Sequence, residues 1–173
     1  MKEGIIMAQV KLGDFIVDLS GDLPEVGTDA PDFLLVQGKT LKNVSLEDFR
    51  GKQLILNIFP TLNTPVCSSA AHKFNKIASD LDDTIVLCIS RDLAWNQEQF
   101  CISNSLDNAV FLSDMRNENF GQDYGVLHTN GNFQGLLARS VVVIGKDKKI
   151  KYSQLVDSTG DEPDYDQLLA NII

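Results

Sequence analysis

One stretch of the sequence decides the fold: Gln53-Leu54-Ile55-Leu56-Asn57-Ile58-Phe59-Pro60-Thr61-Leu62-Asn63-Thr64-Pro65-Val66-Cys67. Its first part, residues 53–59, is a near-continuous apolar run, which is typical of a strand buried on both faces in the middle of an α/β sheet. After Thr64 the apolar residues recur at three- and four-residue steps, which predicts an amphipathic helix. They are Cys67, Ala70, Ala71, Phe74, Ile77, Ala78 and Leu81. The stretch is therefore expected to form a buried strand, a loop and a helix.

Thr64 and Pro65 mark the expected start of this helix. Thr64 can serve as the N-cap, and Pro65 fits the first helical position because its missing N–H is not needed there. Cys67 then lies in the first turn, where free backbone N–H groups and the helix dipole favour the thiolate. An ordinary thiol, with a pKa of about 8.5, is only about 3% ionised at pH 7, so this position predicts a reactive thiol. The spacing alone leaves open that Cys67 is a small apolar residue and Thr64 only a cap.

Strand and helix patterns continue on both sides of this stretch. Gly13-Asp14 lies between two short apolar runs, which predicts a β-hairpin at about residues 8–20. Further strands are expected at 33–36, 84–90, 140–144 and 150–156, a capped helical turn at 45–50, and helices at 92–101 and 163–173. This order predicts an α/β fold with a central mixed β-sheet, helices on both of its faces, and an N-terminal β-hairpin.

Length and composition favour a single domain spanning residues 1–173. The chain has 173 residues, 43% of them hydrophobic, which suits one sizeable core. Aromatic residues expected in that core are Trp95, Phe100 and Phe120. The 15 Lys and Arg residues against 24 Asp and Glu residues give a formal net charge of −9, so neither nucleic acid nor an anionic membrane surface is an expected partner.

The apolar runs are far shorter than the roughly 20 residues of a membrane-spanning helix, so no membrane segment is expected. The N-terminus has neither the long apolar core nor the cleavage-type triplet of a secretory signal. A cytoplasmic location is therefore expected, and either Met1 or Met7 can be the start.

Three cysteines and two histidines limit the possible chemistry. Cys67, Cys88 and Cys101 are too few and too widely spaced for a disulfide framework or for a zinc site. Cys88 lies inside a predicted strand, where a buried apolar thiol is the default. His72 lies five residues after Cys67 and so points elsewhere on the helix, which argues against a Cys-His hydrolase.

Several motifs are distributed along the chain. They are the loop Pro60-x-x-x-Thr64-x-x-Cys67, Lys73-Phe74-Asn75, Val86-Leu87-Cys88-Ile89-Ser90 with Asp92-Leu93, Arg116-Asn117-Glu118, Tyr124-Gly125-Val126, Gly135-Leu136-x-Ala138-Arg139, Ser153-Gln154-Leu155-Val156 and Glu162-Pro163-Asp164-Tyr165. In these motifs the sequence resembles the thiol peroxidases, which are atypical two-cysteine peroxiredoxins with a thioredoxin-like fold. The resemblance covers nearly the whole chain, so it implies that fold and a peroxidase activity on hydrogen peroxide and organic hydroperoxides.

The resemblance implies a role for each residue of the site. Cys67 is the peroxidatic cysteine, whose thiolate attacks a hydroperoxide and becomes a sulfenic acid. Thr64 presents its hydroxyl to the thiolate or to the peroxide, and Pro60 shields the sulfur from water. Arg139 supplies a positive charge that favours the thiolate and stabilises the leaving oxygen. The backbone N–H groups of Val66 and Cys67 complete the peroxide site.

The resemblance also implies a resolving cysteine and partners. Cys101 follows Cys67 by 34 residues and takes the place of the family's resolving cysteine, which implies an intramolecular Cys67–Cys101 disulfide. Since a disulfide needs Cα atoms within about 4.4–6.8 Å, the helix ends must unwind locally to form it. Thioredoxin is the implied reductant. The family is commonly homodimeric and uses no metal, haem or flavin.

At one point the sequence departs from the family pattern. The family commonly has Ser, an aliphatic residue and Asp between the loop Pro and Thr, whereas this chain has Thr61-Leu62-Asn63. Asn63 removes a negative charge near the thiolate, which bears on loop dynamics and substrate preference. Two other functions compete with turnover. One is a peroxide-sensing redox module without rapid recycling. The other is thiol–disulfide exchange on proteins, which the missing Cys-x-x-Cys motif disfavours.

Overall fold

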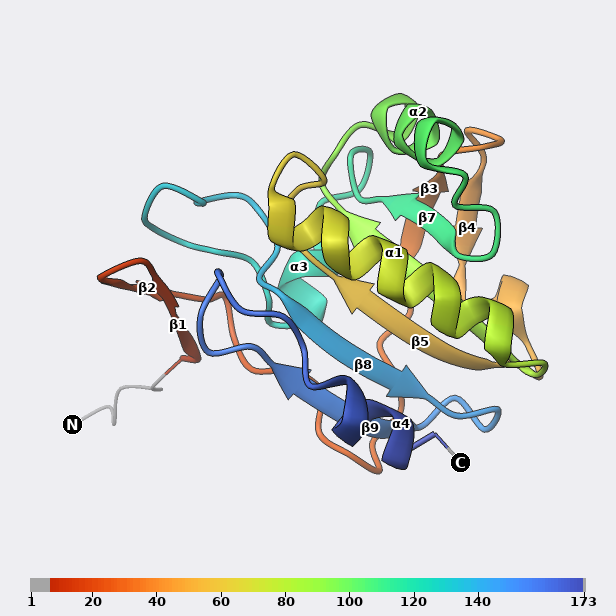
Figure 1. Ribbon diagram of the computed structural model, residues 1–173. Helices are drawn as coiled ribbons and strands as arrows, with labels where there is room; N and C mark the ends of the chain where they lie inside the picture. Colours follow the sequence, from red (N-terminus) through yellow and green to blue (C-terminus); the bar gives the residue numbers. More distant parts are fainter. Residues whose placement is uncertain (1–6, 173) are drawn as a thin grey trace.

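The computed structural model describes residues 7–172, which form a seven-stranded sheet, a two-stranded hairpin and helices on both faces of the sheet (Figure 1). The order of strands in the sheet is β4-β3-β7-β6-β5-β8-β9. Their bounds are β3 (Leu34–Gln37), β4 (Asn43–Ser45), β5 (Gln53–Ile58), β6 (Thr84–Ser90), β7 (Val110–Ser113), β8 (Ser140–Ile144) and β9 (Ile150–Leu155). β5, β6 and β7 are parallel, and the other neighbouring pairs are antiparallel. The predicted mixed sheet is confirmed.

Strand β5 lies inside the sheet, between β6 and β8. Leu54, Leu56 and Ile58 belong to one apolar cluster, whereas Ile55 belongs to a second cluster together with Phe59, just after the strand. Because successive side chains of a strand point to opposite faces, the two clusters lie on opposite faces of the sheet. Both faces of β5 are therefore covered, which explains why its sequence is apolar without alternation.

Helices cover both faces of the sheet, as expected. α1 (Pro65–Asp80) and α4 (Tyr165–Ala170) lie across one face (Figure 1). They pack into the second cluster, as do Phe100 and Cys101 of α2 (Ala94–Asn104). α3 (Asn119–Asp123) contributes Phe120 to the first cluster, on the opposite face. No helix within residues 7–172 is long and apolar enough to cross a membrane.

The N-terminal hairpin has the predicted turn. β1 (Gln9–Leu12) pairs antiparallel with β2 (Phe15–Asp18), and Leu12 lies opposite Phe15. Gly13 between them has a φ of 61°, which glycine adopts without steric cost. Val10 and Val17 belong to the same apolar cluster as Leu54 of the central strand. The hairpin thus shares a core with the main sheet.

Three sequence-based expectations need correction. The second helix begins at Ala94 rather than Asp92, because the Asp92 carboxylate accepts hydrogen bonds from another loop. Trp95 was expected in the core but is 52% exposed, since it lies on the outer face of α2. The last helix spans only Tyr165–Ala170, capped by the Asp164 side chain, and Ile173 lies outside the described residues.

Candidate active site

The loop between β5 and α1 lies at the carboxyl end of the parallel strands, where α/β sheets commonly bind ligands. Helix α1 begins at Pro65, and Thr64 is its N-cap. The Thr64 Oγ1 atom accepts a hydrogen bond from the Cys67 backbone N at 3.3 Å. This is the local structure predicted from the sequence, and it places Cys67 in the first turn of the longest helix.

Cys67 lies beside a buried arginine. Arg139, directly before β8, donates from Nη2 to the Cys67 sulfur at 3.4 Å and to the Thr159 carbonyl oxygen at 3.0 Å. The exposed fraction is 0% for Cys67 and 2% for Arg139. A surface position, the usual one for an arginine, is therefore excluded for Arg139. Residues 72 positions apart in the sequence meet here because β5 and β8 are neighbours in the sheet.

The guanidinium of Arg139 is incompletely paired. Within residues 7–172 it forms no salt bridge with a carboxylate, and its Nε and Nη1 atoms have no hydrogen-bond partner. A buried charge is costly unless an opposite charge or hydrogen bonds compensate it. The group able to supply a negative charge at contact distance is the thiolate of Cys67. The unpartnered N–H groups can bind an oxygen atom at the same place.

The other predicted residues lie in the loop before α1 and in its first turn. Pro60, in the loop after β5, is buried, and Val66, in the first turn of α1, is half-buried. Leu62 and Phe59 share an apolar cluster with Cys67. The Thr64 hydroxyl, which accepts from the Cys67 N–H, still has its own proton to donate. The sulfur therefore lies in an apolar environment with a small set of polar groups.

Two further contacts hold the site, and neither was identified from the sequence. The Asp92 carboxylate accepts hydrogen bonds from the Thr61 hydroxyl at 2.7 Å and from the Leu62 N–H at 2.9 Å. Asp92 is the second residue after β6, at the same sheet edge as the loop, which was the available sequence signal.

Glu162 forms the second contact. Its carboxylate accepts from Ser69, Lys73 and Tyr165 at 3.2, 2.7 and 3.2 Å. The hydrogen bond from Lys73 is the largest cause that lowers the pKa of Glu162. Two motifs far apart in the sequence, around residue 73 and residue 162, are thus joined, and the loop after β9 is held against α1.

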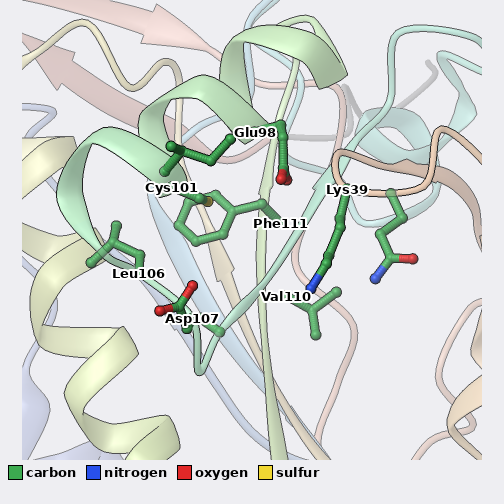
Figure 2. A pocket seen from close by; sticks show the side chains of 10 residues that line it. Lys39, Glu98, Cys101, Leu106, Asp107, Val110 and Phe111 are labelled. Carbon is green, nitrogen blue, oxygen red and sulfur yellow. The ribbon is translucent and has the colours of Figure 1, made fainter.

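Cys101 lies in α2 and lines a pocket of about 390 Å³. Figure 2 shows the sulfur of Cys101 and the ring of Phe111 at this pocket, with Glu98 and Asp107 nearby. Burial, followed by the charges of Glu98 and Asp107, raises the pKa of the Cys101 thiol to about 12. All three cysteines are free, so Cys67 and Cys101 are not joined in this conformation.

Cys88 is a buried thiol of the sheet, and His72 lies on the surface of α1. Cys88 is buried in β6, with Asn57 Nδ2 at 3.6 Å from its sulfur, and burial raises its pKa to about 12. His72 is exposed on α1, near the ring of Phe100, whereas Cys67 points into the core. The buried apolar role predicted for Cys88 is confirmed, and the geometry does not support a Cys-His pair.

Comparison with known proteins agrees with this geometry. The Redoxin family model matches residues 25–169. A thiol peroxidase of Corynebacterium glutamicum is 44% identical over 151 residues, which are 87% of this chain and 90% of that protein. A thiol peroxidase of Mycobacterium tuberculosis is 42% identical over 164 residues, 95% of this chain and 98% of that protein.

Solved structures give the same result. A peroxiredoxin-like protein from Aquifex aeolicus has a TM-score of 0.88 at 34% identity and covers 95% of both chains. A thiol peroxidase from Chromobacterium violaceum has a TM-score of 0.87 at 21% identity, over 94% of both chains, and shows the shared fold. The thioredoxin-like fold and the peroxiredoxin resemblance predicted from the sequence are confirmed. The chain belongs to the Redoxin family, and within it to the thiol-dependent peroxidases of the peroxiredoxin type.

Proposed function

We propose that Cys67 is the peroxidatic cysteine and that Arg139 activates it. The observation that carries this proposal is the 3.4 Å contact between the Arg139 Nη2 atom and the Cys67 sulfur, both buried, with no carboxylate paired to that guanidinium within residues 7–172. The positive charge favours the thiolate over the thiol. Within residues 7–172, neither Cys88 nor Cys101 has a positively charged hydrogen-bond partner, and the pKa values of both thiols are raised to about 12.

In the first step the Cys67 thiolate attacks the terminal oxygen of a hydroperoxide. The S–O bond forms as the O–O bond breaks, which gives a sulfenic acid and an alkoxide or hydroxide that takes up a proton. The unpartnered Nε and Nη1 atoms of Arg139 can donate to the oxygen on which negative charge builds up. Hydrogen peroxide and organic hydroperoxides both fit this chemistry.

Thr64, Pro60 and Val66 complete the proposed peroxide site. The Thr64 hydroxyl proton can be donated to a peroxide oxygen while its oxygen holds the Cys67 N–H. Since that N–H is already used, the Val66 N–H is the backbone donor left in the first turn of α1, where helical N–H groups lack carbonyl partners. Pro60 is buried in the loop and keeps bulk water from the sulfur.

In the second step Cys101 resolves the sulfenic acid. Its sulfur attacks that of Cys67, the disulfide forms, and the hydroxyl leaves as water. Cys101 is a neutral thiol inside α2 in the present conformation, so this step requires α2 to unwind and expose it. A dithiol reductant of the thioredoxin type then reduces the Cys67–Cys101 disulfide to two thiols.

The proposal extends to the whole chain. Residues 1–173 would act as a single domain, supported by the core that the hairpin and sheet share. A cytoplasmic location is supported by the three free thiols. A homodimer is supported by Leu93 and Trp95, which are each 52% exposed at the start of α2. Light scattering after size exclusion tests the homodimer, which predicts twice the mass of the chain.

The experiment that tests the function is NADPH consumption with thioredoxin, thioredoxin reductase and either hydrogen peroxide or cumene hydroperoxide. We expect sustained turnover by the wild type and none by Cys67→Ser. The Cys101→Ser variant should consume one equivalent of peroxide and then stop. Cys88→Ser is the matched control and should retain turnover. Full activity of Cys67→Ser would refute the assignment, and rapid oxidation of Cys67 without recycling would favour the sensing function instead.

A further inference from the structure

The loop that precedes Cys67 and the helix that carries Cys101 are connected through one carboxylate. Asp92 lies between β6 and α2, two residues before the first residue of α2. One carboxylate oxygen accepts from the Thr61 hydroxyl at 2.7 Å, and the other accepts from the Leu62 N–H at 2.9 Å. These contacts fix the middle of the loop between Pro60 and Thr64. Hydrogen bonds to an ionised acceptor are stronger than neutral ones, so this is a firm attachment.

The same carboxylate is linked to the body of α2. The Ser90 hydroxyl donates to Asp92 at 2.7 Å and accepts from the side-chain amide of Gln97 at 3.0 Å. That amide also donates to the Leu112 carbonyl oxygen at 2.9 Å. Gln97 is fully buried and lies four residues before Cys101, on the same face of α2.

We propose that Asp92 is a positioning residue that holds the Cys67 loop to the start of α2 and sets how fast Cys67 and Cys101 can join. This inference rests on the proposed disulfide. For the two sulfurs to meet, the loop must leave Asp92 and α2 must release Gln97. Because the Ser90 hydroxyl bonds both the Asp92 carboxylate and the Gln97 amide, the opening of one attachment weakens the other.

The attachment decides between two fates of the Cys67 sulfenic acid. In one, the Cys101 thiol attacks it, which gives the disulfide and water. In the other, a second hydroperoxide oxidises it to a sulfinic acid and is itself reduced to the alcohol or to water. The first fate requires the loop to open, and the second requires it to stay closed. A weaker attachment therefore favours the disulfide.

The test is a single-turnover reaction with two variants at opposite ends of the contact. Asp92→Asn replaces two acceptor oxygens by one, and Thr61→Val removes one donor. Reduced protein is mixed with hydrogen peroxide and quenched at intervals, and mass spectrometry counts the sulfenic, sulfinic and disulfide forms. The fluorescence of Trp95, the only tryptophan, reports the opening of α2 at the same time.

We expect both variants to form the disulfide roughly tenfold faster than the wild type, because the loss of a hydrogen bond to a charged group makes the opening of the loop easier by about this factor. At high peroxide they should yield less sulfinic acid. In the double variant the two effects should not add, because they remove the same contact. Thr61→Ser, which keeps the hydroxyl, should behave as the wild type.

The matched control is Asp114→Asn. Asp114 is a carboxylate at the end of β7, paired with Arg91 at 3.0 Å, and it makes no hydrogen bond to the loop. Its replacement should lower stability but leave the rate of disulfide formation unchanged. The proposal is overturned if Asp92→Asn and Thr61→Val form the disulfide no faster than the wild type, or if Asp114→Asn accelerates it equally. If the wild type itself forms no disulfide, the proposed function fails and not only the role of Asp92.

Discussion

Arg139 is the residue whose environment most clearly separates this site from an ordinary buried cysteine. Its guanidinium is 2% exposed, contacts the Cys67 sulfur and has two nitrogen atoms without partners within residues 7–172. An arginine in such a place is destabilising for the fold unless an anion or an oxygen ligand is present. The chemistry of the site supplies both, first as the thiolate and then as the leaving oxygen.

Arg139→Met should therefore slow the oxidation of Cys67 by about 10²–10³, the usual effect of removing a preorganised donor to a developing negative charge. The second-order rate constant with hydrogen peroxide measures this effect. Arg116→Met, at an exposed arginine that binds Leu41 and Asn43, is the control and should leave the rate unchanged.

Cys101 is the opposite case, a thiol that its surroundings keep neutral. A pKa of about 12 leaves about a thousandfold less thiolate near neutral pH than an ordinary cysteine has. In Cys67→Ser protein, alkylation of Cys101 by iodoacetamide should be slower than in the unfolded chain by about this factor. It should reach the unfolded rate in denaturant. Equal rates in the folded and unfolded protein would show that α2 does not protect the sulfur.

At the scale of the element, the start of α1 combines a structural and a chemical role. The Thr64 side chain satisfies the Cys67 N–H, and Pro65 begins the helix without an unused donor. The loss of this cap affects both helix stability and the position of the sulfur. The loop before α1 is also bound to Asp92 through Thr61. The loop after β9 is held against α1 by the contact between Glu162 and Lys73.

Thr64→Ala should lower the free energy of unfolding by about 1 kcal/mol, the typical cost of a lost N-cap. Thr64→Ser keeps an oxygen at the same place and should restore most of that stability. Urea unfolding of the reduced proteins measures the difference. An unchanged midpoint in Thr64→Ala would contradict the capping role, and Thr40→Ala, at an exposed turn, serves as the control.

The sequence predicted the strand, cap and helix around Cys67 because these depend on local rules, namely apolar periodicity and the preferences of Thr and Pro at a helix start. It did not predict β7 or α3, whose short segments carry little periodicity and are stabilised by the sheet and the core. The start of α2 was placed too early, at Asp92. The Asp92 carboxylate binds Thr61 and Leu62, thirty and more residues away, and no local pattern shows these contacts.

On the scale of the whole molecule, local sequence patterns also could not show which distant residues meet at the site. Cys67, Thr64 and Pro60 come from one stretch and could be found together, whereas Arg139 was identified through the resemblance to a family. Its contact with Cys67 depends on β5 and β8 being neighbours, which no local pattern shows. The roles of Glu162 and Asp92 depend on tertiary contacts of the same kind. Trp95 was placed wrongly because a large apolar residue is usually buried and this one is not.

The stability of the protein should depend on pH through His128, a residue of the loop after α3 that pairs with Leu19 just after the hairpin. The ring donates from Nδ1 to the Leu136 carbonyl oxygen at 2.9 Å, and Nε2 is buried without a partner in the described structure. Burial is the main cause that lowers the pKa of His128 below its usual 6.5. The folded protein then binds fewer protons than the unfolded chain, so stability is full above pH 6.5 and falls as the pH drops below it.

We expect the free energy of unfolding to fall between pH 6.5 and 5 with a slope of up to about 1.4 kcal/mol per pH unit. His128→Asn can keep the hydrogen bond to Leu136 but cannot be protonated, so its slope in this range should be smaller. Urea unfolding at several pH values measures both proteins. His72→Asn, at an exposed histidine on α1, is the control and should keep the wild-type slope.

The most direct test of the central claim is the location of the first oxidised sulfur. Reduced Cys101→Ser protein is treated with one equivalent of hydrogen peroxide in the presence of dimedone, which traps sulfenic acids, and the modified peptide is identified by mass spectrometry. We expect a single adduct on Cys67, and its rate of formation should fall when Arg139 is also replaced by Met. An adduct on Cys88, or oxidation of Cys67 at the same rate without Arg139, would contradict it.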